Sequence, residues 1–305
     1  MTSGTRGGAK AAYLAGLGWS TIFGLSFLTT KGALASFSPF ELLFLRFALA
    51  TAALGLLAAC SLVRLDFRGK PKPILGLICL VQPIIYFTCE TFGLRETATS
   101  TAGLILGALP AAVAALSVPM LKERLSGRQV AGLAISVIGV VLVVLARASS
   151  SAAGSDSPKG VGLVLCALAS AAFYNVLSKR ASTRYSAVEL TFAMMASGTV
   201  FFGVLALGQD LQGQGFIAFA NAPPTAWAAI AYLGILSSVL AFFLVNFCLA
   251  RLKASQASVF GTITTLVSLA AGVILRGESL ETLSACGAAA IVVGIWTTNK
   301  GASDA

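Results

Sequence analysis

Two ionisable side chains stand inside long apolar runs of the sequence, where a charge is costly. Arg46 lies about six residues into the run 40–60, and Glu90 lies near the end of the run 74–93. An ionised group at such a position is expected to pair with another group, or to face a water-filled cavity or a bound solute. Two interpretations are open: Arg46 pairs with Glu90, or Arg46 binds the carboxylate of a substrate.

Polar and aromatic residues recur on single faces of the same apolar runs. Gln82, Tyr86 and Glu90 are spaced four residues apart, which places them on one stripe of a helix. The other candidates are Trp19 and Phe23, which share a face, and Tyr174, Asn175, Ser237, Phe242 and Asn246. With Arg46, they predict a cavity that binds a neutral or zwitterionic ligand with an apolar side chain. The alternative is that the polar groups join helices and the aromatic rings fill space.

Several kinds of chemistry are excluded by the residue types that the sequence lacks. The chain has no histidine, which removes a Ser-His triad, a His-ligated metal and a His proton relay. It has no G-x-x-x-x-G-K-[ST] loop for ATP, and its six cysteines contain no C-x-x-C pair. We therefore predict neither an enzyme nor a protein with a metal or cofactor. A membrane enzyme or a structural protein stays a remote alternative.

The composition indicates which elements position the candidate residues. Hydrophobic residues make up 57% of the chain and charged residues only 10%, and the mean hydropathy is +0.90. Because a soluble domain carries roughly a quarter charged residues, the solvent of this chain must be lipid. We predict an all-α polytopic membrane protein with ten transmembrane helices, each about 20 residues long. The runs are 11–34, 40–60, 74–93, 98–121, 127–146, 160–180, 186–208, 226–248, 255–275 and 282–298.

The distribution of Lys and Arg predicts the orientation of these spans. With the N-terminus in the cytoplasm, 15 of the 21 basic residues fall in cytoplasmic segments and 5 in outside segments. Cytoplasmic loops carry such an excess of basic residues. Ten spans return the chain to its starting side, so both termini are expected in the cytoplasm. The net charge of +10 then indicates contact with an anionic membrane surface and not with nucleic acid.

The sequence repeats itself, and the repeat predicts two halves. At an offset of 148, Lys31, Ser38 and Glu41 match Lys179, Ser186 and Glu189; at 155, glycines 132 and 139 match 287 and 294. We expect a first five-helix repeat over 11–146, a linker loop over 147–159 and a second repeat over 160–298. Because five is odd, the halves enter the membrane in opposite senses around a central cavity, as in many secondary transporters.

A motif at the start of each closing helix carries a family resemblance. The sequence VPMLKERLSGRQVAGLAISVIGVVLVV at 118–144 matches ILRGESLETLSACGAAAIVVGIW at 274–296. This Glu-x-Leu hinge before a Gly-rich helix resembles the EamA repeat of the drug/metabolite transporter superfamily, and within it the bacterial aromatic amino-acid exporters. Glu123 and Glu278 are the hinge residues, expected to cap the N-termini of the fifth and tenth helices. The hinge is not strictly kept, since Lys122 precedes one Glu and Gly277 the other.

The resemblance implies an inner-membrane protein that carries metabolites outward. Joined to the predicted cavity, it leads us to expect an exporter of neutral, chiefly aromatic, amino acids that works by alternating access. The alternative is a broad exporter of drugs, nucleobases or other metabolites coupled to protons. A carrier of anionic nucleotide sugars would need several Lys and Arg residues in its cavity, and Arg46 is the one basic residue clearly inside a span, so this function is disfavoured. Uniport or proton antiport, and the oligomeric state, stay open.

Overall fold

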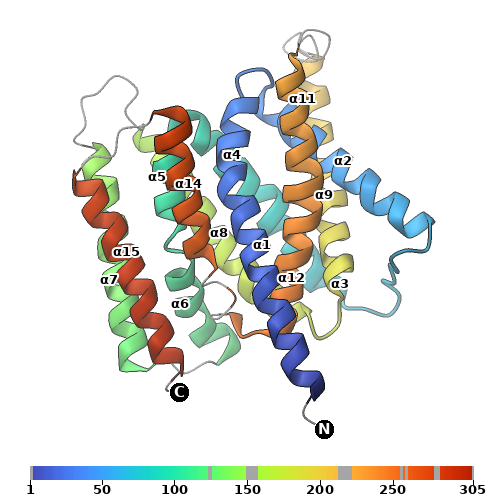
Figure 1. Ribbon diagram of the computed structural model, residues 1–305. Coiled ribbons are helices and arrows are strands. Elements are labelled where there is room, and N and C mark those ends of the chain that lie inside the picture. Colours follow the sequence, from blue (N-terminus) through green and yellow to red (C-terminus); the bar gives the residue numbers. More distant parts are fainter. Residues whose placement is uncertain are drawn as a thin grey trace.

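The computed structural model describes residues 3–122, 126–148, 157–211, 222–254, 257, 260–277 and 282–303. These residues form helices joined by short connections, and no strand occurs among them. Figure 1 shows the helices side by side in one bundle, with the start of α1 and the end of α15 at the same end. An even number of passes through the bundle gives that placement.

The helices follow the expected apolar runs closely. Those of the first half are α1 (Ser3–Ala33), α2 (Pro39–Ala59), α3 (Lys72–Cys79), η1 (Leu80–Tyr86), α4 (Phe87–Glu96), α5 (Thr99–Leu106), α6 (Leu109–Leu121) and α7 (Gly127–Ala148). Those of the second half are α8 (Pro158–Ala181), α9 (Ala187–Asp210), α11 (Pro224–Ala231), η2 (Tyr232–Ala241), α12 (Phe242–Arg251), α14 (Gly261–Arg276) and α15 (Thr282–Ser303). The segments α3–η1–α4 and α11–η2–α12 each form one continuous helical run.

Seven of the described helical runs are long and apolar enough to cross a membrane. Three shorter apolar segments, Gly127–Leu142, Ile263–Leu275 and Ala285–Gly294, coincide with the other expected spans. One expected span differs in detail, since the run 98–121 is broken at Gly107 and Ala108 into α5 and α6. Pro110 lies at the start of α6, and because proline has no N–H it favours a helix beginning there over one passing through.

The two halves share local structural features as well as sequence patterns. Ser38 begins α2 with a capping box to Glu41, and Ser186 begins α9 with a capping box to Glu189. A wide π-helical segment interrupts the third run of each half, η1 in one and η2 in the other. Pro83 lies inside η1, but η2 contains no proline, so proline alone does not account for the wider turn.

Equivalent residues of the two halves also touch each other. The Oγ1 atoms of Thr51 and Thr199, which are 148 positions apart, lie 2.9 Å from each other. A Cβ atom on Gly139 of α7 would lie 2.7 Å from the carbonyl oxygen of Gly287, and one on Gly294 of α15 would lie 2.6 Å from that of Gly132. These contacts are reciprocal, as a two-fold relation between the halves requires. The closing helices α7 and α15 therefore pack on each other within one chain (Figure 1).

Candidate binding cavity

A cavity lies among α1, the runs α3–η1–α4 and α11–η2–α12, and helices α5, α6, α8 and α14, so both halves line it. Its volume is about 70 Å³, which is room for several water molecules. The lining residues are Trp19, Phe23, Ser26, Phe27, Gln82, Tyr86, Phe87, Glu90, Leu106, Leu109, Ala171, Tyr174, Asn175, Ser237, Phe242, Val245, Gly261 and Thr264. Nine of the eleven predicted binding residues are among them, and only Arg46 and Asn246 are not.

Aromatic rings form one wall of the cavity, with Phe242 at their centre. Its ring centroid lies 5.1 Å from that of Phe23, 5.8 Å from Phe87 and 6.0 Å from Tyr174. The ring of Trp19 meets Phe23 edge-on at 5.7 Å. These edge-to-face and tilted contacts connect α1, α4, α8 and α12, and they present ring faces on which an apolar ligand can pack.

Arg46 lies behind this wall and is almost fully buried. Its Nε atom donates to Ser238 Oγ at 3.2 Å, and its Nη2 atom donates to Ser237 Oγ at 3.1 Å. The guanidinium carbon also lies 4.5 Å from the ring centroid of Phe87, close enough for a cation–π contact. Since Ser237 lines the cavity, Arg46 is separated from it by one serine hydroxyl.

No ion pair joins Arg46 to Glu90 among the described residues, so direct pairing of the two does not occur in this conformation. Glu90 is 3% exposed, and its Oε2 atom has no hydrogen-bond partner in the described part of the chain. Gln82 is equally buried, and its Oε1 atom is also without a partner there. The cavity wall therefore presents two acceptor atoms that no described donor satisfies.

Asn246 supports the cavity from behind by joining three helices. Its Oδ1 atom accepts hydrogen bonds from Tyr174 Oη at 2.8 Å and Ser178 Oγ at 2.6 Å, and its Nδ2 atom donates to Thr191 Oγ1 at 3.1 Å. The amide thus fixes the hydroxyl of Tyr174, whose ring lines the cavity. Asn175, beside it, donates to the carbonyl oxygen of Ala171 on its own helix at 2.8 Å.

The two π-helical segments contribute polar lining from both halves. Gln82 and Tyr86 belong to η1, and Ser237 belongs to η2. A π-helical turn inserts extra residues into a helix and is found often at functional sites. The three-residue stripe predicted from α-helical spacing still faces the cavity, because a spacing of four residues completes about one turn in either helix type.

Several lining residues carry no distinguishing signal in the sequence. Phe87 is one of nineteen phenylalanines, and Thr264 lies in an apolar run in which every face looks alike. Thr264 Oγ1 donates to the backbone carbonyl of Ser20 at 3.0 Å, which joins α14 to α1.

The hinge residues Glu123 and Glu278 lie outside the described residues, so their predicted capping role stays a prediction. Most of the expected linker, 147–159, lies outside them as well.

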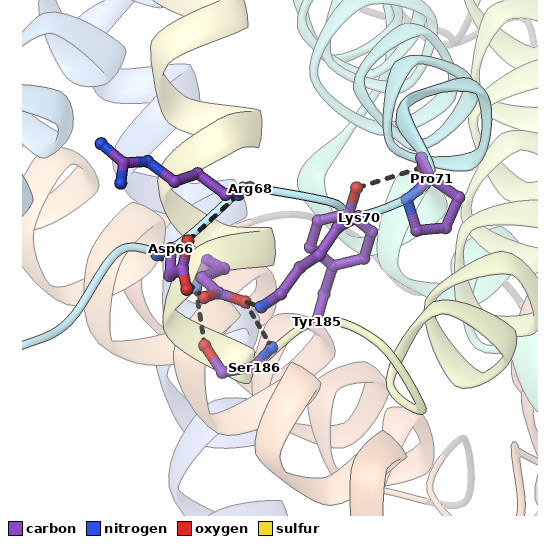
Figure 2. Close-up of polar contacts among 7 residues, drawn as sticks. Asp66, Arg68, Lys70, Pro71, Tyr185 and Ser186 are labelled. Atoms are coloured by element: carbon purple, nitrogen blue, oxygen red, sulfur yellow. Dashed lines mark hydrogen bonds and ion pairs between the residues drawn. The ribbon is translucent and has the colours of Figure 1, made fainter.

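A second polar cluster joins the α2–α3 connection to the start of α9 (Figure 2). Lys70 Nζ forms an ion pair of 2.6 Å with Glu189 Oε2, and the backbone N–H of Asp66 donates to Glu189 Oε1 at 3.0 Å. The same carboxylate accepts from the backbone N–H of Ser186 at 2.9 Å. Tyr185 Oη donates to the carbonyl oxygen of Pro71 at 3.1 Å. The carboxylate of Glu189 thus caps α9 and also holds the α2–α3 connection, which belongs to the other half of the chain.

Replacement of Glu189 with glutamine is expected to release this connection. The amide loses the ion pair with Lys70, and it offers only one oxygen where the carboxylate serves three donors. Hydrogen exchange at the amides of residues 63–70 should become at least several-fold faster. The matched control is Glu41→Gln, which alters the equivalent capping box of α2. Equal exchange at 63–70 in the wild-type protein and Glu189→Gln would show that the carboxylate does not anchor the connection.

Comparisons with known proteins agree with the two-repeat sequence pattern. The model of the EamA-like transporter family matches residues 10–145 and again residues 158–300. A solved structure described as "Crystal structure of protein" shares this fold with a TM-score of 0.64, at 20% identity, over 97% of this chain and 98% of its own. At that identity the likeness concerns the fold alone.

Relatives among curated proteins are described as transporters. The uncharacterized transporter YcxC of Bacillus subtilis is 34% identical over 94% of this chain and 92% of its own length. A probable terminal-alkyne amino-acid exporter of Streptantibioticus cattleyicolor is 26% identical over 76% of this chain and 75% of its own. The resemblance to EamA repeats is thereby confirmed, while the closer resemblance to aromatic amino-acid exporters stays a prediction. The chain belongs to the EamA-like transporter family.

Proposed function

We propose that this chain exports neutral amino acids with apolar, chiefly aromatic, side chains across a bacterial inner membrane. The observation that carries the proposal is the cavity between the halves, where aromatic faces adjoin polar groups. An apolar side chain packs on the rings, and the polar groups hold the head of the molecule. The family match supports transport, and the relative described as an amino-acid exporter supports this class of substrate.

The proposed mechanism is alternating access between two inverted halves of five spans each, with both termini in the cytoplasm. Reciprocal contacts at Thr51 and Thr199, and between α7 and α15, support the two-fold relation. Such a relation gives inward-open and outward-open packings of similar energy. The cavity has a volume of about 70 Å³ in this conformation, so we expect its walls to move apart when a whole aromatic amino acid binds.

Transport by the purified protein in liposomes tests this proposal. Counterflow of phenylalanine and tryptophan is expected to exceed that of lysine and glutamate. Phe242→Leu keeps an apolar side chain but removes the central ring, so the half-saturating phenylalanine concentration should rise about 2- to 10-fold, the value of one aromatic contact. The comparison with and without a pH gradient separates uniport from proton exchange.

Phe243→Leu is the matched control, since this neighbouring phenylalanine does not line the cavity and contacts Phe247 instead. It should transport like the wild-type protein. Transport of drugs or nucleobases without transport of amino acids would show that the proposed substrate class is wrong. An equal effect of the two substitutions would show that the aromatic cluster is not the binding surface.

A further inference from the structure

We propose that Glu90 binds the ammonium group of the substrate and makes a cationic amine a requirement for binding, with Gln82 as a second acceptor in the cavity lining. This inference rests on the proposed function and names the chemical group that the cavity selects. The proposed site is for the amine of the ligand and not for its carboxylate.

The first argument is that two of the three buried polar atoms without a hydrogen-bond partner among the described cavity-lining residues are acceptors, while the third, Trp19 Nε1, is a donor. Glu90 Oε2 and Gln82 Oε1 are buried acceptors with no partner among the described residues. Buried polar atoms are nearly always hydrogen-bonded in native proteins, and an exception calls for a ligand or water. An ammonium group brings three N–H donors and no acceptor, so it can donate to the buried carboxylate of Glu90.

The second argument is that no cation among the described residues forms an ion pair with Glu90. Arg46 is the nearby cation, but its Nε and Nη2 atoms are held by Ser238 and Ser237 and its plane lies near the ring of Phe87. The positive charge of Arg46 is therefore held by Ser237, Ser238 and Phe87 outside the cavity lining, while Glu90 is one of the lining residues. A charge-assisted bond from a ligand is stronger than a neutral one, so an ammonium ion is favoured over a neutral amide or hydroxyl.

The third argument is the position of the two oxygens relative to the aromatic cluster. Gln82 and Glu90 come from the run α3–η1–α4, and the rings of Phe23 and Phe242 come from α1 and α12. In this one cavity, the ammonium group of a ligand can bind the acceptor atoms while its apolar side chain packs on the rings. The described residues contain no group of three or more acidic or Cys side chains that would bind a metal cation instead.

The experiment compares ligands that share a phenyl ring but differ in their charged group. Phenethylamine keeps the amine, 3-phenylpropanoate keeps the carboxylate, and phenylalanine has both. Binding to the purified wild-type protein is measured from the ligand-dependent rise in melting temperature. Phenylalanine and phenethylamine should bind, and 3-phenylpropanoate should bind much more weakly. Glu90→Gln should weaken phenethylamine about 10- to 100-fold, the value of a hydrogen bond to a charged group, without weakening 3-phenylpropanoate.

Glu96→Gln is the matched control, because it makes the same change on the same helix but outside the cavity, where Glu96 contacts Ser157 and Lys159. Its phenethylamine affinity should equal that of the wild-type protein. Equal binding of the amine to wild-type and Glu90→Gln protein, or no binding of phenethylamine at all, would overturn the ammonium site. Phenethylamine binding that depends on Glu90, without phenylalanine flux in liposomes, would support the site and reject only the proposed transport substrate.

Discussion

Replacing Gly139 with alanine is expected to destabilise the protein by about 1–3 kcal/mol, the usual cost of an extra methyl group in a fully packed contact. A Cβ atom at this position would lie 2.7 Å from the carbonyl oxygen of Gly287 and 2.8 Å from the backbone nitrogen of Ile291. Both neighbours are backbone atoms of α15, so no side chain can rotate away. The methyl group must separate α7 from α15, whose glycines allow the close approach.

Thermal unfolding in detergent, followed by loss of the monodisperse gel-filtration peak, measures this effect. Gly55→Ala in α2 is the control, since a Cβ atom there meets nothing within 4 Å. Alanine is the better helix former, so this control should be unchanged or slightly more stable. Gly294→Ala should behave like Gly139→Ala, because its Cβ would meet α7 in the reciprocal way. A melting temperature unchanged by Gly139→Ala would show that α7 and α15 do not hold this packing.

The sequence predicts the helical architecture well because apolar length is a direct physical requirement of a membrane span. It also predicts the repeat, since paired Ser and Glu residues at one offset are rare by chance. The capping boxes at Ser38 and Ser186 show why those pairs recur: each satisfies the exposed N–H groups at a helix start. The sequence does not predict the break between α5 and α6, because a proline inside an apolar run can either kink a span or begin a new helix.

The candidate site is predicted less completely, for a reason of geometry. Helical spacing groups Gln82, Tyr86 and Glu90 on one face, and all three line the cavity. Periodicity cannot show which face of an all-apolar helix meets the cavity, so Phe87 and Thr264 were not identified. Nor could it show that Arg46 binds two serines of the other half, because that contact joins residues far apart in the chain. The wider turns of η1 and η2 have no residue signal shared by both.

Replacing Arg46 with methionine is expected to destabilise the protein by about 1.5–3 kcal/mol, through loss of its charge-assisted bonds to Ser237 and Ser238 and of its longer-range attraction to Glu90. Methionine fills much of the same volume beside Phe87, so the loss is chiefly electrostatic. The serine hydroxyls that lose Arg46 can turn to carbonyl groups of their own helix. Glu90 has no such substitute, because its Oε2 atom already lacks a donor and Arg46 is the nearby positive charge.

The double variant Arg46→Met with Glu90→Gln separates charge from packing. If the charges of Arg46 and Glu90 stabilise each other, the double variant should regain at least half of the stability lost in Arg46→Met, since neighbouring charges couple by about 0.5–3 kcal/mol. SDS titration in mixed micelles gives the free energy of unfolding of the wild-type protein, the two single variants and the double variant. Additive losses would mean that Arg46 acts through Ser237, Ser238 and Phe87 alone. Restored stability in the double variant, together with lost phenethylamine binding, would show that Glu90 serves ligand binding and that its buried charge needs Arg46 for stability.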